Sequence, residues 1–320
     1  MTDNPFLSIV ITAYTAERLE DIYELLNSIK EQTYIHTETL FIVERSKELM
    51  EKIHSYEVKN NIPNLKVILY DGESGLSAAR NVGIKEAAGD IIAFVDDDVL
   101  LYPDWAEKMV KAYKDDAIIG VTGPAFPLWE DTSMAWFPKE FYWIISCTAW
   151  DAEDHIKEVR NAWGMNMSFK REAFEKAGVF SNEFGFHKGP MSEDNEISLR
   201  IKQKTGKKIM YVPDVKLWHR VHKYRLSRKF IKERSYWIGC SRRVMQQLKP
   251  EKQNDGANIL SPEHRLLNRI FTQTFPDIIK KLFTKPMIAG RISRLSITAL
   301  TFVALGYYSY LMPDFSKRNF

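Results

Sequence analysis

The chain has 320 residues, of which 45% are hydrophobic and 27% charged, so it can form one large globular domain or two ordinary ones. Its formal net charge of +3 excludes the strongly basic composition typical of nucleic-acid-binding proteins. The two cysteines make neither a metal-site spacing nor a disulfide framework, and the first five residues lack the pattern of a signal peptide, which together favour a cytoplasmic location for the main domain.

Apolar strands alternate with amphipathic helices through the first hundred residues. We expect strands at residues 7–14, 38–44, 65–70 and 91–95, and helices at 17–32, from Ser46 to before Pro63, and at 78–88. This order predicts an α/β fold with a Rossmann-like, mostly parallel central sheet and helices on both faces. Right-handed crossovers then place the carboxyl ends of the parallel strands along one edge of the sheet.

Acidic residues follow three of these strands. They are Glu44, Asp71 and the run Asp96-Asp97-Asp98. Because side chains alternate along a strand, we expect Asp96 and Asp98 to point the same way and Asp97 the opposite way. Two converging carboxylates repel each other unless a cation lies between them, and Mg²⁺ or Mn²⁺ is the natural partner. The alternative is a solvated acidic turn, which three aspartates alone would favour.

A glycine-containing stretch, residues 71–83, separates the third strand from the next helix. Gly72 and Gly75 allow a tight turn and a close backbone approach, and a helix that begins here offers free N–H groups to a phosphate. Arg80 could add a bidentate phosphate contact. No Gly-Lys-Ser/Thr follows, so this is not a Walker loop, and a plain loop–helix junction with a surface arginine is the alternative.

The middle of the chain offers further candidates among weaker patterns. We expect helices at 103–114 and 171–177 and strands at 118–123 and 208–212, whereas the aromatic residues of 124–160 mostly indicate core packing. Glu193 and Asp194 begin another helix, where complementing the helix dipole is the simpler explanation. His219 follows the last strand and, given the aspartate pair, is a candidate third metal ligand.

The ordered set of motifs resembles the family 2 glycosyltransferases, which have the GT-A nucleotide-diphospho-sugar fold. The resemblance covers roughly residues 6–245 and rests on segments 8–14 with 26–32, 75–83, 94–98 and 164–169, on Glu193-Asp194 with Arg200, and on His219. Each segment alone is a weak signal, and their order makes the match specific.

This resemblance implies inverting transfer of a sugar from a nucleotide-diphospho-sugar to a glycan or polyprenyl-linked acceptor. Asp96, Asp98 and His219 would hold Mn²⁺ or Mg²⁺ on the donor diphosphate, and Asp194 would be the general base. The remaining candidates are Ala13, Glu44, Asp71 and Arg80 at the donor nucleotide, with Asp96, and Gly164, Asn166 and Glu193 at the acceptor or the sugar.

Some positions depart from the family pattern. The family usually has Asp and a Gly-Ser-x-Asp turn after the second strand, whereas this chain has Glu44-Arg45-Ser46-Lys47, which leaves the identity of the nucleotide open. Thr15 replaces a frequent Asn. The absence of a Gln-x-x-Arg-Trp motif argues against a processive polysaccharide synthase.

The end of the chain differs in composition from the rest. We expect a catalytic domain at 1–249, a linker at 250–262 and an amphipathic, apolar helical segment at 263–320. Residues 295–312 carry no charge and are near the minimum length of a membrane span, although a buried helix or hairpin would have the same composition. We therefore expect membrane contact through 263–312, peripheral or as a single C-terminal span, with the catalytic domain on the cytoplasmic face.

Two other classes of function remain open at this stage. A metal-dependent nucleotidyltransferase or phosphohydrolase would use the same carboxylates and release pyrophosphate or phosphate. A non-catalytic, membrane-tethered protein that binds nucleotide sugars would use the acidic residues as helix caps and surface. The sequence specifies neither the sugar, the nucleotide, the acceptor nor the linkage.

Overall fold

A computed structural model describes residues 4–148, 153–182, 193–247 and 260–309. Among them, residues 4–127, 153–182 and 193–220 form one compact unit, called the sheet unit below. Residues 128–148, 221–247 and 260–309 form a second, called the helical unit. The predicted linker at 250–262 lies outside the described residues except for 260–262, and the predicted boundary at 249 stays a prediction.

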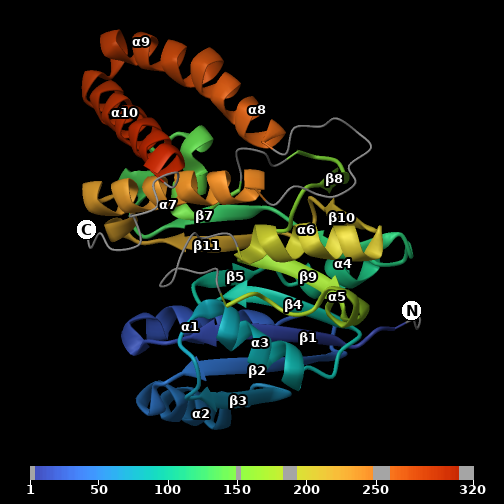
Figure 1. The fold of residues 1–320 in the computed structure, drawn as a ribbon. Helices are drawn as coiled ribbons and strands as arrows, with labels where there is room; N and C mark the ends of the chain where they lie inside the picture. The colour runs from blue at the N-terminus through green and yellow to red at the C-terminus, as the bar shows by residue number, and fades with distance from the viewer. Residues whose placement is uncertain (1–3, 149–152, 183–192, 248–259, 310–320) are drawn as a thin grey trace. The chain divides into compact units, whose positions relative to one another are not determined.

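The sheet unit contains an eight-stranded sheet of order β3-β2-β1-β4-β9-β6-β10-β8 (Figure 1). The first four strands of this order are parallel, as predicted. β9, which the sequence did not indicate, runs antiparallel between β4 and β6, and β10 is parallel to β6 but antiparallel to β8. The strands are β1 Leu7–Ala13, β2 Thr37–Glu44, β3 Leu65–Tyr70, β4 Ile91–Asp96, β6 Ile118–Thr122, β8 Lys157–Val159, β9 Asn166–Lys170 and β10 Lys208–Tyr211.

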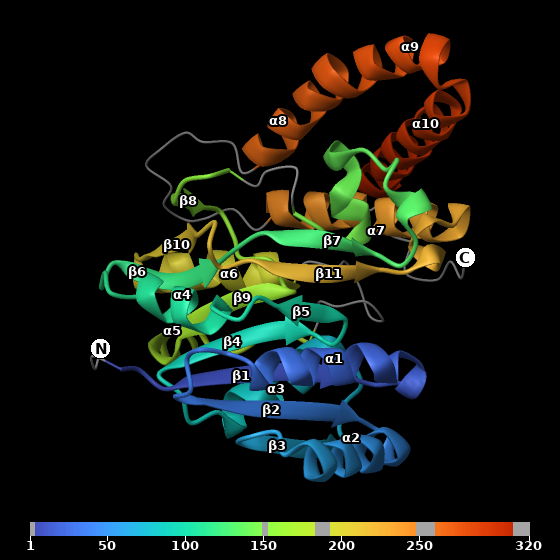
Figure 2. The same ribbon diagram turned by 180° about the vertical axis from the view of Figure 1, so that it is seen from behind.

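Helices cover both faces of this sheet. The central strands β1 and β4 are therefore buried on both sides, which explains their nearly continuous apolar sequences. α1 (Leu19–Lys30), α2 (Lys47–Asn60) and α4 (Trp105–Ala112) share a core with Ile9 and Ile11 of β1 (Figure 2). α3 (Leu76–Glu86), α5 (Arg171–Ala177) and α6 (Glu193–Thr205) share the opposite core with Val10 and Phe94. The two cores therefore alternate along β1, as the pleat of a strand requires.

A second, three-stranded sheet has the order β5-β11-β7. Its strands are β5 Val99–Leu101, β11 Leu217–Val221 and β7 Ala125–Trp129. β5 follows β4 after a two-residue turn, and β11 pairs antiparallel with it so that His219 lies opposite Val99. The backbone N–H of Arg220 also donates to the carbonyl of Asp98 at 2.9 Å. This pairing brings a segment from late in the chain to the end of β4.

The helical unit contains α7 (Arg228–Gln247), α8 (Ser261–Arg269), α9 (Phe275–Thr284) and α10 (Pro286–Ser309), with a short π-helix at Ile270–Thr274 and a 3-10 helix at Lys139–Ile145. Its core joins Phe141 and Ile145 to Ile231, Leu295 and Ala299. Some of the aromatic residues assigned to core packing, such as Phe137 and Tyr142, do pack here. Among the described residues, α10 is the one helix long and apolar enough to cross a membrane by length and composition.

Candidate active site

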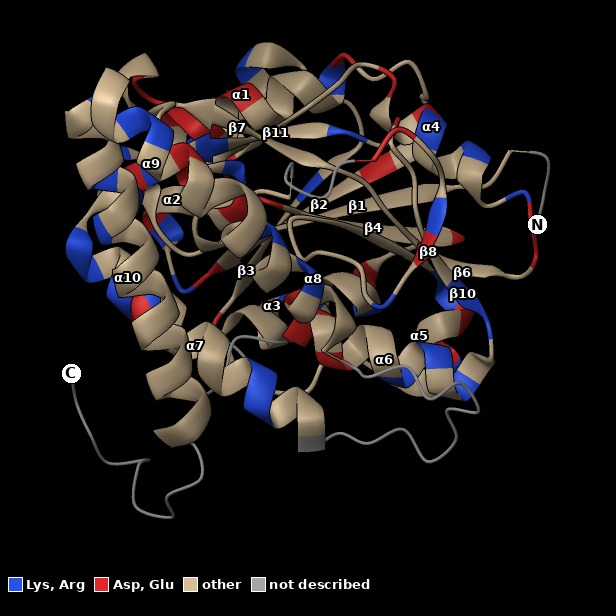
Figure 3. Ribbon diagram, turned by 90° about the horizontal axis from the view of Figure 1, so that it is seen from above, with Lys and Arg blue, Asp and Glu red and all other residues tan. Residues whose placement is uncertain are grey.

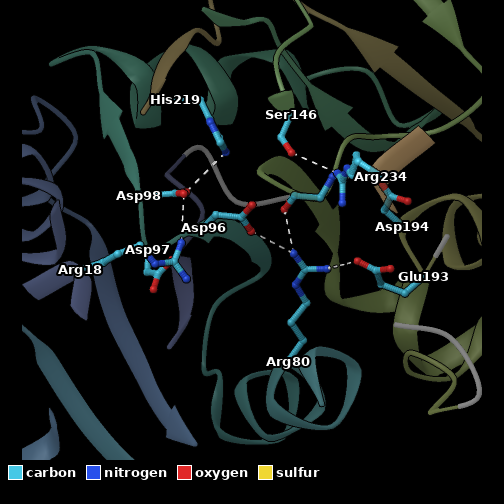
Figure 4. Close-up of polar contacts among 11 residues, drawn as sticks. Arg18, Arg80, Asp96, Asp97, Asp98, Ser146, Glu193, Asp194, His219 and Arg234 are labelled. Carbon is cyan, nitrogen blue, oxygen red and sulfur yellow. Dashed lines mark hydrogen bonds and ion pairs between the residues drawn. The ribbon is translucent and has the colours of Figure 1, made fainter. Parts of the chain in front are cut away.

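The carboxyl end of β4 carries the acidic residues predicted to bind a metal. Asp96, Asp98 and His219 each offer a ligand atom, and these atoms lie within 4.8 Å of one another (Figure 4). The side chains of Asp98 and His219 are buried, whereas that of Asp96 is partly exposed. Two carboxylates and an imidazole are a donor set that suits Mn²⁺, so the residues present fit the ion that the sequence predicted.

Asp96 and Asp98 converge as predicted, whereas the expectation that Asp97 points away from Asp98 is wrong. β4 ends at Asp96, and Asp97 and Asp98 form the turn that leads into β5. Both side chains contact the same guanidinium, because Nη1 of Arg18 lies 2.9 Å from Asp97 Oδ1 and 3.0 Å from Asp98 Oδ2. Side chains do not alternate between two faces within a turn. The direction of the Asp98 side chain is therefore set by the turn between β4 and β5.

Arg18 is a site residue that the sequence reasoning missed. It ends a short 3-10 helix, Ala16–Arg18, whose N-cap Thr15 accepts a hydrogen bond from the N–H of Glu17 at 3.2 Å. One oxygen of Asp98 faces Arg18, while the other lies 3.4 Å from Nε2 of His219. The available signal was a cation just after the first strand, on the edge where the acidic strand ends were expected to gather.

Arg80 connects the aspartate cluster to the start of α6. Its side chain is buried, with Nη2 3.2 Å from Asp96 Oδ1 and 3.1 Å from the carbonyl of Gly164, and with Nη1 3.2 Å from Glu193 Oε1. The guanidinium also lies 5.6 Å from the centre of the Phe180 ring. Arg80 is therefore not a surface arginine, and its charge is shared by two carboxylates from distant parts of the sequence.

Asp194 lies in the first turn of α6 with its carboxylate held by N–H donors. Oδ2 accepts from the backbone N–H of Gly164 at 3.1 Å, and Oδ1 accepts from the backbone and the side chain of Asn195 at 2.7 and 2.8 Å. A Cβ on Gly164 would lie 3.2 Å from Arg80 Nη2 and 3.7 Å from Asp194 Oδ2. The small residue thus leaves room for Arg80 to contact its carbonyl while Asp194 accepts from its N–H.

The electrostatic environment of Glu193 follows from this arrangement. Burial raises the pKa of its carboxyl group, and the neighbouring charges of Asp194 and Asp96 raise it further, whereas Arg80 lowers it. The net shift of this pKa is upward. Ionisation of Glu193 is thus less favourable in the folded protein than in the unfolded chain, even with Arg80 beside it.

The candidates for the nucleotide pocket lie at the ends of β1, β2 and β3. Glu44 Oε1 accepts hydrogen bonds from the hydroxyl of Ser74 and from the N–H of Gly75 at 3.2 Å, so it lies beside the glycine-containing turn before α3. Ala13 is buried at the end of β1, and Asp71 is exposed just after β3. The structure brings Glu44 to the turn, and it gives these residues no role by itself.

Asn166 occupies a different environment from the other candidates. Its side chain is fully buried, where Oδ1 accepts from the indole N–H of Trp105 at 3.0 Å and Nδ2 donates to the carbonyl of Val215 at 2.7 Å. These bonds tie β9 to α4 and to the segment before β11. The structure therefore places its amide within the core.

Comparison with known proteins gives a consistent result. The sequence model of the family described as "Glycosyl transferase family 2" matches residues 8–178. The chain is 29% identical to the glucosyl-dolichyl phosphate glucuronosyltransferase of Haloferax volcanii over 98% of this chain and 99% of that protein. It is 26% identical to glycosyltransferase AglE of the same organism over 56% of this chain and 57% of that protein.

Solved structures show the same fold at low sequence identity. The mannosyltransferase PcManGT from Pyrobaculum calidifontis, in complex with GDP-Man and Mn²⁺, matches with a TM-score of 0.61 and 18% identity over 98% of this chain and 82% of that one. GalNAc-T7 with UDP, GalNAc and Mn²⁺ matches with a TM-score of 0.53 and 17% identity over 86% of this chain and 57% of that one. The GT-A fold predicted from the sequence is thereby confirmed.

Asp98→Asn tests the metal assignment. We expect this change to weaken Mn²⁺ binding by more than about 100-fold, because changes to residues behind the ligands already cost about 10- to 100-fold. The electron paramagnetic resonance signal of free Mn²⁺ during titration measures the affinity. Asp104→Asn, at a partly exposed position outside the cluster, is the matched control. Equal affinities of the wild type and Asp98→Asn would refute the assignment.

Glu193→Gln tests the electrostatic environment of Glu193. Because the pKa is raised in the folded protein, the protonated form favours folding, and this contribution is lost as the pH rises through the folded-state pKa. We expect the free energy of unfolding of the variant to increase relative to that of the wild type as the pH rises above about 4, the ordinary pKa of a glutamate. Urea unfolding of the metal-free proteins measures it, with the exposed Glu175→Gln as control. A relative decrease would mean that the pairing with Arg80 outweighs burial.

Proposed function

Because this chain belongs to glycosyl transferase family 2, we propose that it transfers a glucuronosyl or closely related residue from a nucleotide-diphospho-sugar to a sugar carried on a lipid phosphate. The chain is a nucleotide-sugar-dependent glycosyltransferase with the GT-A fold. The observation that carries the proposal is the arrangement in which Arg80 links the Asp96, Asp98 and His219 cluster to Glu193, the neighbour of Asp194. The similarity to the Haloferax volcanii glucuronosyltransferase over nearly the whole of both chains supports the sugar and the acceptor class.

The donor side of the reaction would use residues at the ends of β1 to β4 together with His219 of β11. Asp96, Asp98 and His219 would hold Mn²⁺, which when bound neutralises the charge that builds on the departing nucleoside diphosphate. Arg18 keeps the Asp98 carboxylate in place through its ion pair. Glu44, which lies beside Gly75, would accept a hydrogen bond from the edge of a nucleobase, and Ala13 and Asp71 would complete the proposed nucleoside pocket.

On the acceptor side, Asp194 would act as the general base. Its carboxylate would take the proton from an acceptor hydroxyl while that oxygen bonds to the anomeric carbon and the bond from this carbon to the diphosphate oxygen breaks. A single displacement of this kind inverts the anomeric configuration. The N–H groups of Gly164 and Asn195 orient the carboxylate, and Gly164 and Glu193 lie next to it, where an acceptor or donor sugar would bind.

The proposed acceptor implies that the protein works at a membrane surface. A lipid-linked sugar stays at a bilayer surface, so we propose that the enzyme works as a membrane-associated protein on the cytoplasmic face. The apolar helix α10 and the basic residues around it support membrane association.

Donor hydrolysis tests the proposed reaction class. Purified protein in detergent is incubated with a panel of nucleotide sugars, including a nucleotide-linked glucuronate, in Mn²⁺, Mg²⁺ or EDTA. We expect metal-dependent release of nucleoside diphosphate from the glucuronate donor, with a smaller release in Asp98→Asn. Release of pyrophosphate or inorganic phosphate instead would point to nucleotidyl transfer or phosphohydrolysis, and absence of both donor binding and Mn²⁺ binding would contradict catalysis.

Asp194→Asn distinguishes two kinds of acceptor. If the acceptor group is a sugar hydroxyl, we expect the variant to lose about 10²- to 10⁴-fold in kcat, because proton transfer by a positioned base contributes that much. A lipid phosphate is already ionised and needs no base, so with such an acceptor this variant would stay active while Asp98→Asn would not. Single-turnover transfer to a lipid-linked glucose and to the bare lipid phosphate compares the two cases. A mild effect on transfer to the sugar would disprove the role of Asp194.

A further inference from the structure

The elbow between α9 and α10 presents large apolar side chains to solvent. Ile279, Leu282, Phe283 and Met287 are 60%, 52%, 87% and 81% exposed. They lie within nine residues of the sequence, around the single residue Lys285 that joins the two helices. Such a cluster, called the apolar elbow below, marks an interaction surface, because a soluble surface rarely gathers several bulky apolar side chains in one place.

The charge around the apolar elbow has one sign. Between Ile278 and Ser309 the sequence contains no Asp or Glu, and its charged residues are Lys280, Lys281, Lys285, Arg291 and Arg294 (Figure 3). Lys281 is paired with Asp277, whereas Lys280 and Lys285 are exposed at the elbow itself. Apolar side chains flanked by exposed lysines are complementary to the headgroups and the acyl boundary of an anionic bilayer.

α10 packs closely against α7, so the charges on α7 bear on whether α10 can cross a membrane. A Cβ on Gly239 of α7 would lie 2.1 Å from the carbonyl oxygen of Val303, and one on Gly306 would lie 1.9 Å from that of Tyr236. The backbones of α7 and α10 are thus in direct contact. The hydroxyls of Tyr236 and Ser309 are also 2.9 Å apart, near the end of α10.

The helix that accompanies α10 is charged. Lys232 Nζ lies 5.2 Å from the centre of the Phe302 ring, and the guanidinium of Arg243 lies 5.6 Å from that of Tyr307. If α10 spanned a bilayer, these cations of α7 would be carried into the hydrocarbon region, where charged side chains are costly. The pairing therefore favours a position of α10 outside the hydrocarbon core.

Several exposed apolar residues of α10 lie on one side of the helix. Met287, Ile297, Leu305 and Tyr308 are exposed, and at 3.6 residues per turn they fall within an arc of about 80°. The opposite side carries the buried residues Ile292, Leu295 and Ala299. The same arc also contains the exposed Arg294 and Thr301. One exposed face with a cation among apolar side chains and one buried face are typical of a helix that lies on a surface, whereas a lone span is apolar all round.

We propose that the apolar elbow docks the protein onto the surface of an anionic lipid bilayer, and that α10 lies along this surface without crossing it. The proposal rests on the proposed function only for the choice of a lipid surface as partner, since a lipid-linked acceptor is presented there. The apolar side chains enter the headgroup region, and Lys280 and Lys285 face the anionic headgroups.

Vesicle flotation of the full chain tests the docking surface. The vesicles contain phosphatidylglycerol in phosphatidylcholine or phosphatidylcholine alone, and the variants are Leu282→Ser with Phe283→Ser, and Lys280→Gln with Lys285→Gln. Because each buried apolar side chain contributes substantially, we expect the apolar variant to bind anionic vesicles about 10- to 100-fold more weakly. The charge variant should lose the preference for anionic vesicles. The controls are Ile35→Ser, which removes an apolar side chain that is 86% exposed in the sheet unit, and Lys229→Gln.

Three outcomes would overturn the proposal. The first is equal vesicle binding by the apolar variant and the wild type. The second is wild-type protein that stays in vesicles through alkaline carbonate extraction, which indicates a span. The third is wild-type protein that ignores vesicles but forms a dimer by light scattering that the apolar variant lacks, which makes the elbow a contact between copies of the chain. Donor hydrolysis in detergent is measured on every variant and should be unchanged, so failure of docking and failure of the proposed reaction give separate signals.

Discussion

The buried guanidinium of Arg80 is the interaction on which the rest of the site depends. It contacts Asp96 at the end of β4, the carbonyl of Gly164 before β9, and Glu193 at the start of α6. Without this charge, the carboxylates of Asp96, Glu193 and Asp194 would repel one another in a poorly hydrated place. Removing one member of a buried charged group leaves the others uncompensated, so the arrangement holds together as a unit.

A second constraint is the turn between β4 and β5. The turn makes it possible for Asp98 to lie between Arg18 and His219, and the antiparallel pairing of β5 with β11 supplies the histidine. Residues behind metal ligands fix the orientation of those ligands, and Arg18 would act in this way on Asp98 at the proposed metal site. The cluster therefore draws on segments from the start, the middle and the end of the sheet unit.

The helical unit, unlike the strands of the sheet unit, combines a closed core with a cluster of exposed apolar side chains. Its core is closed by aromatic and aliphatic side chains of the 3-10 helix at Lys139–Ile145 and of α7 and α10, while the α9–α10 elbow keeps its apolar side chains outside. The same segment has excess positive charge. A surface that is both apolar and basic is complementary to an anionic lipid interface, where the proposed lipid-linked acceptor would be presented.

The sequence alone determined the α/β order, the parallel strands β1 to β4 and the acidic strand ends, because hydrophobic period and strand alternation are local properties of the chain. The order of motifs also identified the family. Only the tertiary structure revealed β9 between β4 and β6, the ion pairs of Arg18 with Asp97 and Asp98, and the burial of Asn166 in the core. These three features depend on pairing and packing between residues far apart in the chain, which local sequence patterns do not predict. For the same reason, composition allowed α10 to be a membrane span, whereas its contacts with α7 are a property of the folded chain.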